Sequence, residues 1–153
     1  MTTFAANVPF LMHVFGAMVL VGAVATAVVF SLVSWARTEP STAADAARRT
    51  FRTLLFVAFP AWWVMRIGAQ WLYNEQGWED VPEEPAWIGI GYMTAEAGGL
   101  LLLIGIILSG IGARRLRRAE GGSSPLVRVT SVLVSIALLA WVVTVWAMSG
   151  KPS

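Results

Sequence analysis

The chain has 153 residues, of which 57% are hydrophobic and only 13% are charged. Soluble domains usually carry about 25% charged residues, so a chain this apolar would expose too much nonpolar surface in water and is expected to need lipid. It contains no cysteine, which excludes disulfide frameworks, thiolate chemistry, zinc fingers and iron–sulfur clusters.

Four apolar runs follow one another along the chain, approximately at residues 8–34, 53–73, 87–112 and 126–148. Each is long enough to cross a hydrocarbon core of about 30 Å as a helix, the element that satisfies its own backbone groups in lipid. The first run is too long for a signal-peptide core, and no Lys or Arg precedes it, so we expect it to be retained. Pro60 should kink the second run.

The fold class that these runs predict is all-α. We expect a polytopic membrane protein with a single transmembrane domain, residues 1–153, that forms a four-transmembrane-helix bundle.

The connections between the runs differ in charge, and the difference predicts the topology. Nine of the eleven basic residues lie in or beside the first and third connections: Arg37, Arg48, Arg49, Arg52, Arg114, Arg115, Arg117, Arg118 and Arg128. The second connection has no basic residue and carries Glu75, Glu79, Asp80, Glu83 and Glu84. By the positive-inside rule, the first and third connections are cytoplasmic and both termini lie outside. The expected location is the bacterial cytoplasmic membrane, with Arg114–Arg118 as a topology anchor that can also touch anionic lipid.

Only three ionisable side chains fall within the predicted spans: His13, Arg66 and Glu96. A charge at the bilayer centre costs at least about 2.5–3.5 kcal/mol, so such groups usually face the protein interior and pair. Counting at 1.5 Å per residue from the outer helix ends places all three about 8–13 Å below the outer boundary. Antiparallel packing of the second and third spans would let Arg66 and Glu96 form an ion pair.

Neighbouring side chains are expected to complete an interior ligand-binding site. Gln70 and Tyr92 lie one helical turn above Arg66 and Glu96, and small residues that follow His13 at helical spacing favour a position facing the bundle. The predicted ligand-binding residues are His13, Trp62, Trp63, Arg66, Gln70, Tyr92, Glu96 and Trp141; His13 is also the candidate metal ligand, and no catalytic residue is predicted.

Structural interpretations of the same residues stay open. Arg66 and Glu96 can be an ion pair that only holds helices together, and His13 can simply bond a neighbouring carbonyl. The tryptophans can belong to the interfacial belt or to packing. Two glycine-bearing faces on the third span, one near Glu96 and one opposite, favour a contact with another subunit and hence a homodimer.

Three groups of short motifs run through the chain. They are His13-Val14-Phe15-Gly16 with Val21-Gly22; Phe59-Pro60 with Gly68, Trp71-Leu72 and Gly77-Trp78; and the ending Trp146-Ala147-Met148-Ser149-Gly150-Lys151-Pro152. Together they resemble a bacterial membrane family known as domain of unknown function 2269, which is itself distantly like the membrane part of copper-resistance protein D. The resemblance implies four helices and a functional position at His13, and it implies no particular activity.

Three functions fit these observations. The first is binding of a small ligand or redox cofactor, such as a quinone, a haem b whose iron His13 would ligate, or a copper ion held by His13 with Met12. The second is a non-catalytic accessory subunit of a larger membrane complex, and the third is an ion or proton pathway in an oligomer. Apart from the lipid bilayer, we therefore expect a homo-oligomer or a membrane complex as partner, and no nucleic acid. The sequence has no nucleophile–base pair near His13, no zinc signature and no phosphate loop, so it does not support a hydrolase, and it leaves open whether the protein is an enzyme of another kind.

Overall fold

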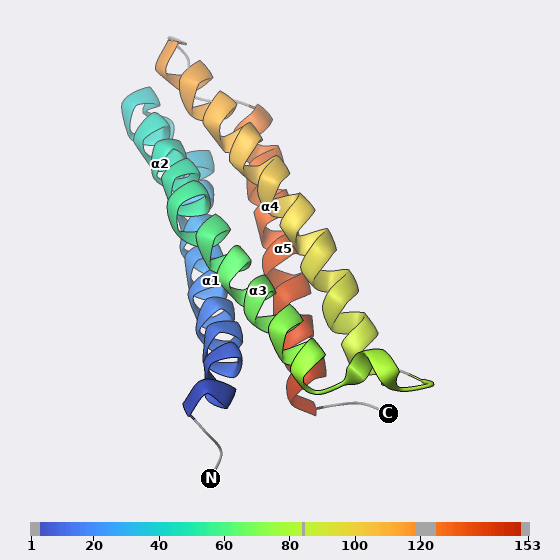
Figure 1. Ribbon diagram of the computed structural model, residues 1–153. Helices are drawn as coiled ribbons and strands as arrows, with labels where there is room; N and C mark the ends of the chain where they lie inside the picture. The colour runs from blue at the N-terminus through green and yellow to red at the C-terminus, as the bar shows by residue number, and fades with distance from the viewer. Residues whose placement is uncertain (1–3, 84, 119–124, 151–153) are drawn as a thin grey trace.

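The computed structural model describes residues 4–83, 85–118 and 125–150, and every element that it forms there is helical. The elements are α1 (Phe4–Ala36), α2 (Pro40–Thr53), the π-helical turn η1 (Leu54–Ala58), α3 (Phe59–Glu75), the 3₁₀ turn η2 (Trp78–Asp80), α4 (Ala86–Arg118) and α5 (Pro125–Gly150). They form an elongated bundle in which the start of α1 and the end of α5 lie at the same end (Figure 1).

Three helices in the described part of the chain are long and apolar enough to cross a membrane: Val8–Ala36 within α1, α4 and α5. The all-helical prediction is therefore confirmed, and the first, third and fourth apolar runs lie in helices that are able to cross a membrane. Each helix extends beyond the apolar run that predicted it. The clearest case is α4, which continues through its terminal arginines to Arg118, because arginine is a good helix former and needs no lipid around it.

The second apolar run differs from a simple span. The backbone stays helical from Pro40 to Glu75, but the run begins at the last residue of α2 and passes through the π-helical turn before α3 starts. Pro60 explains the turn, since proline has no N–H and its ring would meet the carbonyl of Phe56 in a regular α-helix. In the wider turn, the Phe59 N–H donates to Leu54 O, five residues back. The predicted disturbance at Pro60 is thus a π turn.

The helices α1 and α3 are in backbone contact at two glycines. A Cβ atom on Gly16 would lie 2.5 Å from the backbone nitrogen of Met65, and one on Gly68 would lie 2.5 Å from that of His13. Helix α1 also packs against α5, and α5 packs along α4, so the main core lies among these helices. Small residues permit such contacts, which matter in lipid because apolar side chains gain little by leaving it.

Most glycines on the two glycine-bearing faces of α4 are occupied within the chain, whereas Gly89, near the start of the helix, has nothing within 4 Å. A Cβ on Gly98 would meet the Trp141 indole of α5 at 2.5 Å, and one on Gly99 would meet the Trp62 indole of α3 at 2.6 Å. Further along, Gly105 lies against Val134. The small residues therefore serve packing inside one chain, and they no longer support the predicted homodimer.

A second, smaller core closes the end of the bundle at which α2 begins. It consists of Ala43, Ala44 and Ala47 of α2 with Ala113, Leu116 and Val127 of α4 and α5. Helix α2 is thus amphipathic: its alanines face the bundle and its arginines face outward.

The contact between α1 and α3 yields a test with a matched control. Gly16→Ala should lower the free energy of unfolding by about 1–3 kcal/mol, because the added methyl meets backbone atoms that cannot rotate away. Gly22→Ala on the same helix meets nothing within 4 Å, so it should be neutral or stabilise by about 0.5–1 kcal/mol through helix propensity. Thermal unfolding in detergent compares the two. Equal effects of both substitutions would contradict the close contact.

Candidate functional site

Arg66 and Glu96 form the expected ion pair, between α3 and α4. Nη2 of Arg66 lies 2.6 Å from Oε1 of Glu96, and Nε donates to the same oxygen at 2.8 Å. Both nitrogens contact the same carboxylate oxygen. The other oxygen, Oε2 of Glu96, and the other terminal nitrogen, Nη1 of Arg66, make no hydrogen bond within the described part of the chain. The pair keeps one acceptor and one donor for something else.

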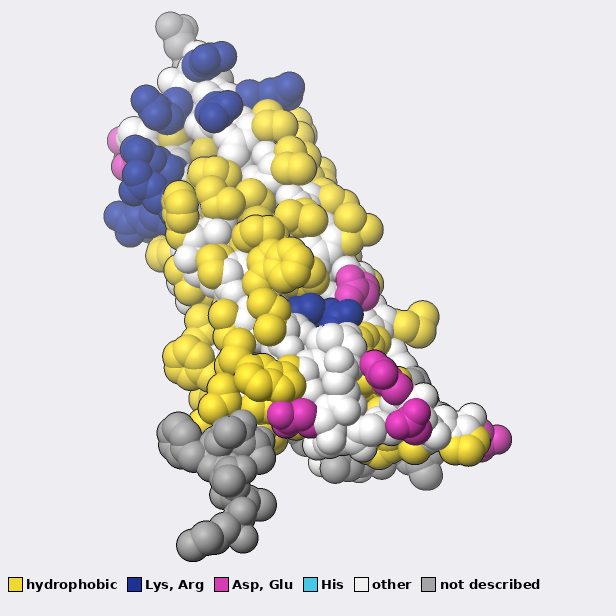
Figure 2. Space-filling model, in the orientation of Figure 1, with side chains coloured by type: hydrophobic (Ala, Val, Ile, Leu, Met, Phe, Trp, Pro, Cys, Tyr) yellow, Lys and Arg dark blue, Asp and Glu magenta, His cyan; other side chains and the backbone are white. Residues whose placement is uncertain are grey.

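The ion pair does not lie in the interior, as the sequence had led us to expect. The Arg66 side chain is 20% exposed and that of Glu96 is 58% exposed. Glu96 falls on the outward stripe of α4 between Met93 (76% exposed) and Leu100 (60%), whereas Ala95 points into the bundle. Figure 2 shows basic and acidic side chains meeting on the surface within the hydrophobic part of this face. The carboxylate therefore faces the medium that surrounds the helices.

Two more predicted residues extend the pair by one turn. The Arg66 guanidinium lies 4.6 Å from the centroid of the Tyr92 ring, and the Tyr92 hydroxyl donates to Oε1 of Gln70 at 3.2 Å. A cation over an aromatic face is attracted by the ring quadrupole, most strongly where water is absent. We call Arg66, Gln70, Tyr92 and Glu96 the polar strip. It runs along the seam between α3 and α4, where sequence spacing had placed these residues at matching levels.

The three predicted tryptophans take different positions. Trp62 lies one turn below Arg66 and donates its Nε1–H to Ala95 O at 3.1 Å, across the same seam. Trp63 is exposed and meets Trp62 edge to face, with 4.9 Å between ring centroids. Trp141 is 2% exposed and packs on Gly98 from α5, and its Nε1 has no hydrogen-bond partner within the described residues. Trp62 and Trp63 thus border the polar strip, and Trp141 belongs to the core.

His13 lies apart from the polar strip. Its Nδ1 is 3.3 Å from Met65 O, on the side of α3 that packs against α1, whereas Arg66 faces α4. The hydrogen bond fits the structural interpretation of this histidine and leaves its functional role a prediction. No group of three or more His, Cys, Asp or Glu side chains able to hold a metal ion occurs among the described residues.

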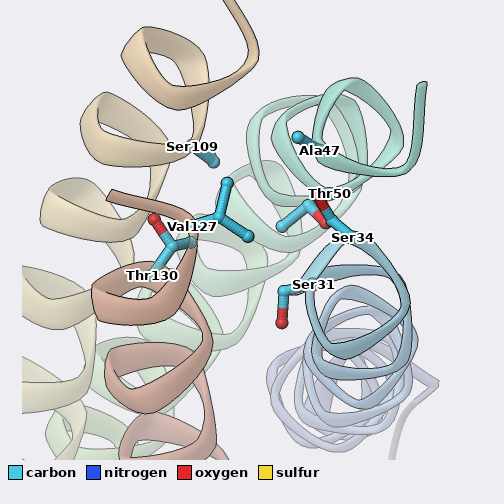
Figure 3. Close-up of a pocket in the computed structure, with 7 residues that line it drawn as sticks. All are labelled: Ser31, Ser34, Ala47, Thr50, Ser109, Val127 and Thr130. Carbon is cyan, nitrogen blue, oxygen red and sulfur yellow. The ribbon is translucent and has the colours of Figure 1, made fainter. Parts of the chain in front are cut away.

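A second polar cluster, which sequence reasoning missed, lies near the opposite end of the bundle. Small hydroxyl and apolar side chains from α1, α2, α4 and α5 surround a cavity of about 10 Å³ (Figure 3). The lining residues are Ser31, Ser34, Ala47, Thr50, Ser109, Val127 and Thr130. The sequence does contain a sign of this cluster, because five of the lining residues are Ser or Thr within or near apolar runs.

The hydroxyls of this cavity are already bonded to backbone carbonyls. Four of them donate within their own helices, and Ser34 Oγ donates to Ala43 O of α2 at 2.7 Å. The volume admits at most about one water molecule. We therefore assign the cluster to helix packing and place the candidate functional site at the polar strip.

Known proteins give no further guide, since no family model, curated protein or solved structure matches the chain. The resemblance suggested by the short motifs stays a prediction.

The ion pair can be tested with a double-mutant cycle. Arg66→Ala leaves an unpaired carboxylate on an apolar surface, so it should destabilise the protein more than the double variant with Glu96→Ala does. We expect a coupling energy of about 0.5–3 kcal/mol, measured from unfolding in detergent. Additive effects of the two substitutions would mean that the pair contributes nothing to the fold.

The hydroxyl cluster offers a second comparison. Ser34→Ala removes the only one of these five hydroxyl bonds that joins two helices, and it should cost about 0.5–1.5 kcal/mol. Ser31→Ala removes a bond within α1 and should cost clearly less. A larger loss from Ser31→Ala would contradict the role of Ser34 in fastening α2 to α1.

Proposed function

We propose that the polar strip binds an amphiphilic molecule dissolved in the bilayer, with a flat, carbonyl-bearing head of the quinone class. The observation that carries the proposal is the exposed position of Glu96 between Met93 and Leu100. Leaving a charged pair against lipid is costly, and a bound polar head would offset that cost.

The chemistry of the strip supports this class of ligand. Arg66 has a free Nη1, and the exposed Gln70 has a second amide N–H besides the one that donates to Asn74 Oδ1, so both can donate hydrogen bonds to carbonyl oxygens. Tyr92, Trp62 and Trp63 supply aromatic surface around them. An apolar tail would lie along the exposed hydrophobic side chains of α3 and α4.

Haem b is less well supported as the ligand. The candidate axial ligand His13 already contacts Met65 O and stands where α1 and α3 touch through Gly16 and Gly68. A flat head group on an open seam needs no such space between helices. The ligand site that we propose therefore keeps the polar strip from the predicted set and leaves out His13.

We also propose that the chain crosses the membrane four times, with both termini outside. Exposed apolar residues of the Pro40–Glu75 run extend from Phe56 to Trp71, about 22 Å along the helix. Its exposed arginines at one end, and the acidic residues around η2 at the other, match the positive-inside rule (Figure 2). On the resemblance stated above, the membrane is that of a bacterium.

The exposed carboxylate also favours a second candidate, an accessory subunit of a membrane complex. A polar group on a transmembrane helix of another protein could cover Glu96 and use its free Oε2. An ion pathway is not favoured. Between the polar strip and the hydroxyl cavity, the described core is filled by apolar side chains, among them Leu54, Leu102 and Val134.

The test is a titration of the purified protein in lipid nanodiscs with a short-chain quinone, followed by tryptophan fluorescence. We expect saturable quenching, and about tenfold weaker binding in Arg66→Ala, because a hydrogen bond from a charged donor is lost. Trp63→Phe should reduce the quenched signal while changing affinity little. Glu75→Gln, outside the strip, is the control.

Three outcomes would redirect the proposal. Unsaturable quenching, or quenching with equal affinity in Arg66→Ala, would contradict a quinone site at the strip. A polypeptide that co-purifies with the wild type and is lost in Glu96→Ala would support the accessory subunit instead. A Soret band that disappears in His13→Ala would restore haem.

A further inference from the structure

The end of the bundle opposite the termini carries a dense group of arginines, which we call the basic end. Arg37 follows α1, three arginines lie on α2, four end α4, and Arg128 lies in the first turn of α5. Figure 2 shows their side chains gathered at one end of the molecule. The members are Arg37, Arg48, Arg49, Arg52, Arg114, Arg115, Arg117, Arg118 and Arg128, and all are exposed.

The protein neutralises only a small part of this charge itself. Among the described residues, Arg66 and Glu96 form the one ion pair, and neither belongs to the basic end. Two carboxylates of the described chain lie at this end, Glu39, which accepts hydrogen bonds from the hydroxyls of Ser41 and Thr42, and the exposed Asp45 of α2, so the nine arginines keep a large excess of positive charge. Because the nine guanidinium groups repel one another, binding of anions that are not part of the protein is favourable at this end.

The arginines begin where the apolar surface ends. On α1, Trp35 is exposed two residues before Arg37, and on α5 the exposed Val129 follows Arg128 directly. On the other two helices the change from exposed apolar residue to arginine takes about one turn, at Phe56 to Arg52 and at Ile111 to Arg114. One turn is about 5.4 Å, close to the thickness of the headgroup layer.

Two of the arginines lie back against rings of α1. The Arg49 guanidinium is 5.9 Å from the centroid of Phe30, and that of Arg128 is 5.8 Å from Trp35. Phe30 lies seven residues before Arg37, about 10 Å along α1, so the Arg49 guanidinium points from the arginines toward the apolar surface. These contacts hold two of the guanidinium groups beside the apolar surface of α1, next to the lipid rather than out in the solvent.

We infer that the basic end is a binding surface for the phosphate groups of anionic phospholipids in the adjacent leaflet. Helices α2 and α4 lie side by side there, so guanidinium groups from both can contact the same or neighbouring phosphates. Arginine suits this task because its planar fork donates two hydrogen bonds to phosphate oxygens. The inference concerns lipid, and it does not depend on what the polar strip binds.

The experiment compares the binding of two lipids to the protein purified in micelles of an uncharged detergent. In micelles, the protein does not have to keep one orientation in a membrane. Native mass spectrometry counts bound phosphatidylglycerol and phosphatidylcholine after addition of equal amounts. We expect phosphatidylglycerol to be retained preferentially, to raise the melting temperature and to be released by salt. Inorganic phosphate at the same concentration should not displace it, since free phosphate lacks the acyl chains.

Variants locate the surface. R48Q/R49Q/R52Q on α2 should bind phosphatidylglycerol several-fold more weakly than the wild type. R48K/R49K/R52K keeps the charge but lacks the forked guanidinium group, so its affinity should lie between those of the glutamine variant and the wild type. R114Q/R115Q/R118Q provides the same test on α4 if the α2 variant does not fold. Glu75→Gln/Glu79→Gln at the opposite end is the control. Equal retention of both lipids, or undiminished retention in both glutamine variants, would overturn the inference.

Discussion

Helices in lipid gain little from burying apolar side chains, so this bundle depends on places where backbones can touch. The strongest constraint is the contact of α1 with α3 at Gly16 and Gly68, where added methyl groups would overlap backbone atoms. On the opposite side, Gly98 lets α4 receive the Trp141 ring from α5. These two tight seams, joined by the packing of α1 against α5, set the positions of all the other elements.

The seam between α3 and α4 is built differently, and this explains the position of the polar strip. Few backbone positions of α3 and α4 approach each other, and long side chains span the gap. Trp62 reaches Ala95 O, and Arg66 reaches Glu96. Long polar side chains can bridge helices at a distance that small residues cannot. The seam is consequently the part of the bundle where a ligand or another helix can add contacts without displacing a backbone.

The π turn before Pro60 matters for the direction in which the strip faces. An extra residue in one turn rotates everything that follows by about 100° relative to a continuous α-helix. The π turn therefore changes the direction in which the side chains of α3 point relative to the alanines of α2, although the chain is helical throughout Pro40–Glu75. The turn lets one continuous run pack α2 against α1 and α4 and still turn Arg66 toward Glu96.

The sequence by itself determined what depends on position along a helix axis. The apolar runs, the side that carries the arginines and the matching levels of Arg66 and Glu96 all follow from composition and a rise of 1.5 Å per residue. Only the tertiary structure decided rotation about each axis. It put Glu96 on the surface, turned His13 toward Met65 O and packed other helices of the same chain against most glycines of α4. Rotation depends on which neighbour each helix packs against, and the spacing of residues along one helix contains no information about that neighbour.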